Sequence, residues 1–156
     1  MRRYGVAMLA VASLFPGFPS PAAHGDAKAV AVAKELQAFK GAWRVISKEV
    51  DGKKISEEEI KDVILTSDGS GKFSGRRGDK VFVEATARLD SAKNAKAIDV
   101  TYTEGEKKGK TVPGIYEIDG DTVQVCLGRP GDDRTGEFSA KAGSGRTLVV
   151  YKREKK

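Results

Sequence analysis

Residues 35–52 read ELQAFKGAWRVISKEVDG and contain the only tryptophan in a chain of 156 residues. Before the tryptophan, apolar residues recur at helical spacing over 26–40, and Gly41 follows where the end of a helix favours a residue with positive φ. After it, the apolar residues adopt the period of two that is typical of a strand. Trp43 is therefore predicted to lie where a short N-terminal helix ends and the first β-strand begins.

The period of two returns throughout the rest of the chain. Its longest run covers 81–89, where small or apolar residues alternate with Phe82, Glu84, Thr86 and Arg88. Shorter runs of the same kind are separated by turn-forming residues, most often an acidic residue next to glycine. Together these runs predict about eight strands. They cover 43–50, 62–67, 72–75, 81–89, 97–103, 112–119, 122–127 and 147–152.

Turn chemistry indicates how these strands connect. Asp119-Gly120 lies between two alternating runs and predicts a two-residue type I′ hairpin. Ser56 stands three residues before Glu59, a capping-box spacing that predicts a helical turn between the first two strands. Sequential hairpins without a long crossover helix favour an all-β, up-and-down antiparallel barrel, which removes exposed strand edges, with a sandwich as the alternative. A barrel of about eight strands can hold one small ligand.

The beginning of the chain resembles a secretory signal peptide. A basic start is followed by an apolar stretch over 5–15, a break at Pro16 and small residues that favour cleavage after Ala22. The apolar stretch is too short to span a bilayer, so we expect no membrane span and an exported protein, periplasmic or extracellular. This organisation predicts a signal peptide at 1–22, a linker and the start of the helix at 23–35, and a barrel domain at 36–154.

Several kinds of chemistry are not expected. His24 is the only histidine and lies at the start of the mature chain, which argues against histidine-dependent catalysis and zinc sites in the folded domain. Cys126, the only cysteine, is interpreted as a small apolar residue of a strand, with a reactive thiol as the alternative. The net charge of +6 is mild, and the basic segments lack interleaved aromatic residues, so we expect no nucleic-acid binding. We also expect no enzymatic activity, no metal and no cofactor.

A family resemblance adds to this interpretation. A short helix followed by Gly41-x-Trp43 at the start of an antiparallel meander is similar to the opening of a lipocalin-type barrel. The resemblance implies that Trp43 plugs the closed end and that an arginine near the last strand, Arg146 or Arg153, covers it. Stretches spread over 36–154 also resemble an uncharacterised lipocalin-like domain family expanded in planctomycete-type bacteria. These stretches are LQAFKGAWRVIS, DGKKISEEEIKDVIL, AIDVTYTEGEKKGKTVPGIYEIDGDTVQVCLG and RTGEFSAKAGSGRTLVVYKRE.

The alternating strands also predict an inner face. In a barrel, small residues there leave space beside larger apolar ones, which predicts a binding protein for a small apolar or amphipathic molecule. The same residues are compatible with a filled core, in an interaction or structural module of the cell envelope that acts through its loops; no protein partner is indicated. The residues expected to line the interior are Val81, Val83, Ala85, Ala87, Val100, Tyr102, Tyr116 and Val123.

Overall fold

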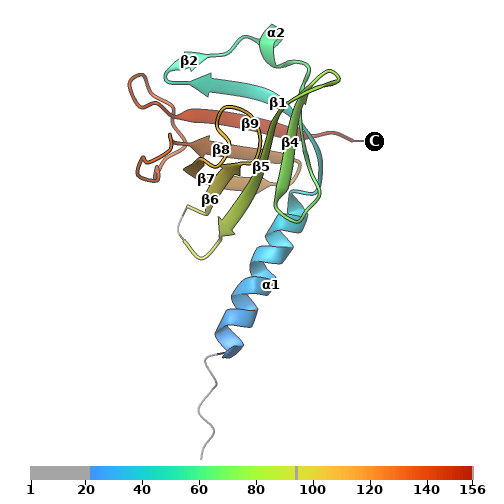
Figure 1. Ribbon diagram of the computed structural model, residues 1–156, viewed down its shortest axis with the longest axis vertical. Helices are drawn as coiled ribbons and strands as arrows, with labels where there is room; N and C mark the ends of the chain where they lie inside the picture. Colours follow the sequence, from blue (N-terminus) through green and yellow to red (C-terminus); the bar gives the residue numbers. More distant parts are fainter. Residues whose placement is uncertain (1–21, 94, 156) are drawn as a thin grey trace, which may run out of the picture.

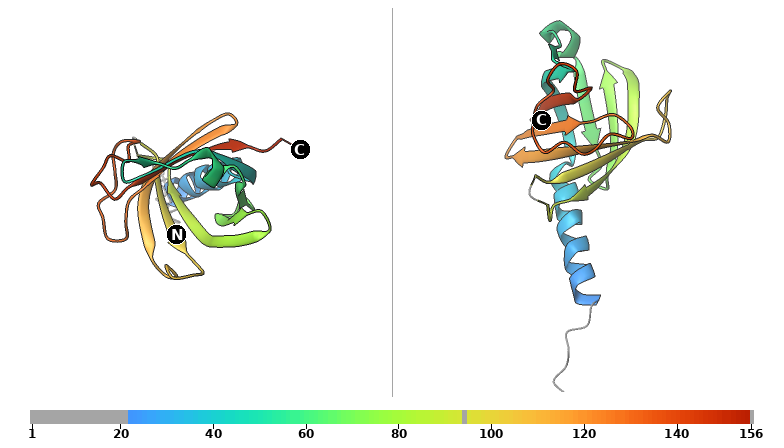
Figure 2. Two further views of the ribbon diagram at one scale, coloured as in Figure 1. Left: turned by 90° about the horizontal axis from the view of Figure 1, so that it is seen from above. Right: turned by 90° about the vertical axis from the view of Figure 1, so that its left-hand side faces the viewer.

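In the computed structural model, which describes residues 22–93 and 95–155, one helix is attached to one end of a β-barrel (Figure 1). Apart from Ala22, the expected signal peptide lies outside the described residues. Figure 2 shows α1 leaving the same end of the barrel in a second orientation. The elements are α1 (Ala22–Ala38), β1 (Gly41–Val50), β2 (Lys53–Lys54), α2 (Glu57–Ile60), β3 (Val63–Ser67), β4 (Lys72–Arg77), β5 (Lys80–Asp90), β6 (Ala97–Tyr102), β7 (Thr111–Asp119), β8 (Thr122–Leu127) and β9 (Thr147–Arg153).

The strands form a single antiparallel sheet that closes on itself. From β3 onward each strand pairs with the next one along the chain, and β1 pairs with both β3 and β9. The two-residue strand β2 pairs with the last two residues of β1, Glu49 and Val50. The predicted all-β, lipocalin-like up-and-down barrel of eight strands is confirmed, and closure leaves few backbone groups unpaired at sheet edges.

Two local predictions differ from the structure in detail. Asp119 pairs with Thr122, so Gly120 and Asp121 form the hairpin loop, and only Gly120 has a positive φ, which fits a type II′ turn better than type I′. The predicted helical turn is confirmed as α2, but its capping box does not form. The Ser56 side chain makes no hydrogen bond to the backbone there, because its hydroxyl donates to the carboxylate of Glu59 at 2.9 Å.

An aromatic cluster fills the closed end of the barrel, next to the end of α1. Trp43 is 1% exposed, and its Nε1 donates to the carbonyl oxygen of Phe39 at 2.7 Å. The Phe39 ring lies 5.7 Å from the ring of Phe73 and 5.4 Å from that of Tyr116, measured between centroids. The end of α1 is therefore part of the barrel core, whereas Val30 earlier in the helix is 68% exposed.

Gly41, two residues before Trp43, lies beside the arginine that covers the tryptophan ring. Of the two arginines left open by the sequence, Arg153 is the one that lies on Trp43, with its guanidinium carbon 4.1 Å from the ring centroid. Gly41 has a φ of 120°, and a Cβ at this position would lie 3.4 Å from Nη1 of Arg153. The backbone conformation therefore favours glycine, whereas a Cβ would only be in ordinary van der Waals contact with the guanidinium.

Candidate functional site: a cavity inside the barrel

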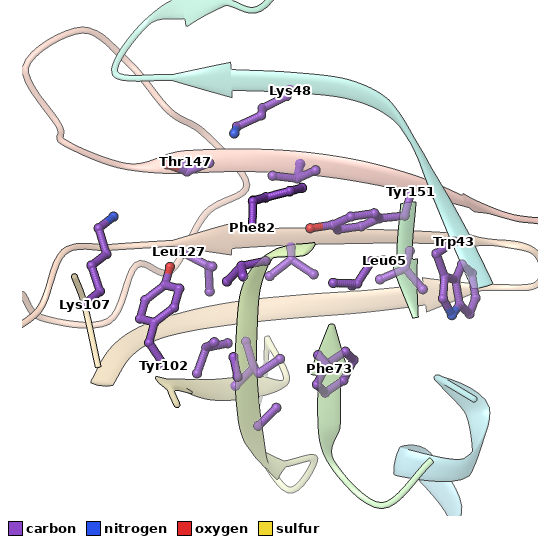
Figure 3. A pocket seen from close by; sticks show the side chains of 18 of the residues that line it. Trp43, Lys48, Leu65, Phe73, Phe82, Tyr102, Lys107, Leu127, Thr147 and Tyr151 are labelled. Carbon is purple, nitrogen blue, oxygen red and sulfur yellow. The ribbon is translucent and has the colours of Figure 1, made fainter. Parts of the chain in front are cut away.

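A cavity of about 610 Å³ occupies the barrel interior (Figure 3). Its deep end is formed by Phe39 and Trp43, next to α1. Its other end is lined by Tyr102 and Lys107, where β6 leads into the following loop, and by Phe82, which is 56% exposed. The cavity therefore runs from the aromatic plug to an open mouth at the opposite end of the barrel.

The wall of the cavity is mostly apolar. Ala85 and Ala87 on β5 are buried, and their small side chains leave space that larger residues would fill. On the facing strands, Val123, Val125 and Val149 contribute branched aliphatic groups. An apolar wall of this kind excludes water and favours contact with hydrocarbon or aromatic groups.

Most of the residues expected to face the interior belong to the cavity wall, and two do not. The wall includes Val83, Ala85, Ala87, Val100, Tyr102 and Val123. Val81 instead is 50% exposed, because β4 and β5 shift register at this point: Gly75 pairs with Val83 and Arg76 with Val81, which leaves Phe82 as an extra residue.

Tyr116 differs from the prediction in another way. It is 1% exposed and packs against Phe39, but it is not part of the cavity wall. Its hydroxyl donates to a carboxylate oxygen of Glu35 on α1. Tyr116 thus joins the barrel to the helix below the cavity floor.

Two polar residues of the cavity wall, Lys48 and Tyr151, were not expected from the sequence. A register shift in β1 between Val45 and Ser47 changes the alternation of side chains, so that Lys48 lines the cavity. Without the shift, alternation from Trp43 and Val45 would place Ser47 on the inside. Tyr151 also lines the cavity. The sequence could have indicated this, because Tyr151 is two residues after Val149 in the last strand and therefore lies on the same face of it.

The mouth combines positive charge with phenol groups. Burial lowers the pKa of Lys48, and the positive charges of Arg77 and Lys107 lower it further, against a smaller opposite effect of Glu59. Burial raises the pKa of Tyr102 and of Tyr151, so both phenols stay protonated and able to donate hydrogen bonds.

Lys107 and two carboxylates complete the mouth. The Lys107 amine lies 5.5 Å from the centroid of the Tyr102 ring, a cation–π distance. Glu104 and Glu106 lie on the same loop and are exposed, and Glu104 forms an ion pair with Lys108 at 3.7 Å. Glu104 and Glu106 thus line the mouth on its exposed loop, and Lys48 lines it from the half-buried strand β1.

Cys126 lies away from the cavity. It is completely buried, its thiol donates to the carbonyl oxygen of Ser139 at 3.5 Å, and burial raises its pKa. Within 22–93 and 95–155, no group of three His, Cys, Asp or Glu side chains is arranged to hold a metal ion. None of the helices described for this chain has the length and apolarity needed to cross a bilayer.

Comparison of the sequence with models of known protein families and with curated proteins gives no match.

Proposed function

We propose that this protein is an exported, non-enzymatic binding protein that holds one small apolar or amphipathic molecule inside its barrel. The observation that supports this proposal is the cavity of about 610 Å³ with its mostly apolar wall. Pockets that bind small molecules have volumes of about 300–1,000 Å³ and a similar combination of apolar walls and few polar groups. The export part of the proposal rests on the signal-peptide pattern of residues 1–22.

The size of the cavity favours this function over an envelope module with a filled core. Protein interiors are normally packed as densely as organic crystals, and empty space inside them lowers stability. In this barrel Trp43 and Tyr116 are only 1% exposed at the plug end, and the cavity extends from Trp43 past Ala85 and Ala87 toward the mouth. Space left at one end of an otherwise packed interior is the arrangement expected of a binding protein.

The test is binding of a neutral apolar dye, N-phenylnaphthylamine, to the folded mature protein. We expect its fluorescence to rise on binding, and Ala85→Phe to abolish this rise because the new ring fills the cavity. Arg88→Phe places the same ring on an exposed position of the same strand and is expected to leave dye binding unchanged. Circular dichroism shows whether both variants are folded.

The filled-core alternative gives a different result. In that case the dye does not bind the wild-type protein, and Ala85→Phe lowers stability by about 1–3 kcal/mol through overpacking. Native mass spectrometry of protein purified gently from its own host adds a second test. A discrete extra mass that is lost on denaturation identifies the natural ligand, whereas a bare mass together with absent dye binding contradicts the proposal.

A further inference from the structure

The position of Lys48 is the strongest indication of which molecule the cavity accepts. Its side chain comes from β1 and lines the inner wall at the mouth (Figure 3). In the figure its amine lies at the same end of the cavity as Lys107, Thr147 and the Tyr102 hydroxyl, far from Trp43. An ammonium group at this half-buried position is partly removed from water, which is unfavourable unless a partner compensates for the lost hydration.

Lys48 also has no counterion among the residues that the structure describes. Some exposed lysines, Lys61 and Lys96 among them, form ion pairs at 2.7 Å with carboxylates, and other lysines that the structure describes form none. No carboxylate lies within 4.0 Å of the Lys48 amine, and no hydrogen bond to this amine is present in the described part of the chain. Burial and the neighbouring cations Arg77 and Lys107 depress its pKa. An anion placed at the mouth would stabilise this ammonium.

The groups around Lys48 suit the head of an amphipathic anion. The phenols of Tyr102 and Tyr151 line the same cavity and remain protonated, so they can donate hydrogen bonds to an oxyanion. Lys107 adds a second positive charge at the rim. Negative charge is also present, since Glu104 and Glu106 line the exposed loop of the mouth, and Glu59 raises the pKa of Lys48 by less than Arg77 and Lys107 lower it.

The interior beyond Lys48 suits an apolar tail. The β9 partners of Trp43 and Lys48, Arg153 and Val149, are four positions apart, about 13 Å of extended strand. The wall between Lys48 and Trp43 carries Leu65, Val123 and Val149 and ends at the plug. A single hydrocarbon chain with its head at the mouth would therefore reach the aromatic floor.

We propose that the ligand of this barrel is a single-chain amphipathic anion, with its carboxylate or similar acidic head at Lys48 and its hydrocarbon tail directed toward Trp43. This inference rests on the proposed function, since it assigns the chemical class of the molecule held in the same cavity. It assigns Lys48 as the residue that selects the head group, with Tyr102, Tyr151 and Lys107 as additional contacts.

Displacement of bound N-phenylnaphthylamine measures the preference for the head group. We compare dodecanoate with dodecanamide and dodecyltrimethylammonium, which have the same tail with a neutral or a positive head. We expect dodecanoate to displace the dye at a concentration about tenfold lower than dodecanamide or dodecyltrimethylammonium requires. This is the size of effect given by one hydrogen bond to a charged group. Lys48→Gln should remove this preference, and Lys48→Arg should retain most of it.

Lys152→Gln is the matched control, since it removes one lysine from an exposed position of β9. It is expected to leave the preference for dodecanoate unchanged. Dye binding that persists without any preference for the anion overturns this inference and leaves the proposed function intact, whereas absence of dye binding contradicts the proposed function itself. A preference that survives in a folded Lys48→Gln variant also overturns the assignment of Lys48.

The orientation of the tail has its own test, because Trp43 is the only tryptophan. Bromine quenches indole fluorescence at close range. We expect ω-bromoundecanoate, which carries bromine at the tail end, to quench Trp43, and α-bromoundecanoate, which carries it beside the carboxylate, to have little effect. Equal quenching by both, or stronger quenching by the α isomer, contradicts the proposed orientation.

Discussion

The guanidinium of Arg153 lies on the indole ring of Trp43, 4.1 Å from its centroid, and at the same time holds the end of α1. Its Nη1 donates to the carbonyl oxygen of Lys40 and its Nη2 to that of Ala38, both at 2.8 Å. Ala38 is the last residue of α1 and its carbonyl has no partner within the helix, and Lys40 lies in the link to β1, so these bonds satisfy groups that would otherwise depend on water. One side chain of the last strand thus joins the first strand, the helix and the plug.

Arg153→Met is expected to lower the free energy of unfolding by about 1–3 kcal/mol, because methionine keeps part of the packing on the ring but loses the cation–π contact and both hydrogen bonds. A urea melt of the mature protein measures this loss. Arg88→Met is the control at an exposed position and is expected to change stability by less than about 0.5 kcal/mol. Equal effects of the two substitutions would show that the Arg153 contacts contribute little.

Trp43→Ala is expected to be more damaging, with a loss of about 3–5 kcal/mol, because it leaves a cavity at the closed end in addition to removing buried apolar surface. The hydrogen bond from the indole to Phe39 is lost as well. Trp43→Phe keeps an aromatic ring in place and should cost less. A urea melt in which Trp43→Ala loses less than about 1 kcal/mol contradicts the role of this residue as a plug.

Much of the barrel could be predicted from the sequence because the alternation of side chains in strands is a local property. β8 occupies the predicted residues 122–127, and β5 extends the predicted run 81–89 by one residue at each end. Local patterns of this kind arise from the pleat of a single strand and from the residues that tight turns require. Because consecutive strands pair through hairpins, the order of β3 to β9 in the sheet is their order along the chain.

The mouth of the cavity could not be predicted in the same way because it depends on two register shifts. One inserts an extra residue in β1 and brings Lys48 to the inner wall, and the other leaves Phe82 as an extra residue in β5 and places Val81 outside. A bulge reverses the inward and outward positions that follow it, and its place depends on the paired strand. The choice of Arg153 over Arg146 likewise depends on the pairing of Arg153 with Trp43 across β1 and β9.

The contact between α1 and the barrel also involves a titratable group. Glu35 accepts hydrogen bonds from the Tyr116 hydroxyl and, at 2.7 Å, from the Lys96 amine. Burial alone would raise the pKa of Glu35, but these two hydrogen bonds and the charge of Lys96 outweigh it, so the pKa lies below the ordinary value of 4.5. A carboxylate whose pKa is lowered by folding stabilises the folded state when it is ionised.

This contribution is expected to depend on pH in a defined direction. It is fully present above pH 4.5, the ordinary value for glutamate, and is lost as the pH falls through the lower pKa of the folded state. Glu35→Gln cannot ionise, so urea melts should show the largest difference in stability from the wild type near neutral pH and a smaller one in acid. Tyr116→Phe removes one of the two donors and should weaken the pH dependence without abolishing it. A difference between wild type and Glu35→Gln that is the same at neutral and acid pH would mean that the ionised carboxylate does not hold α1 against the barrel.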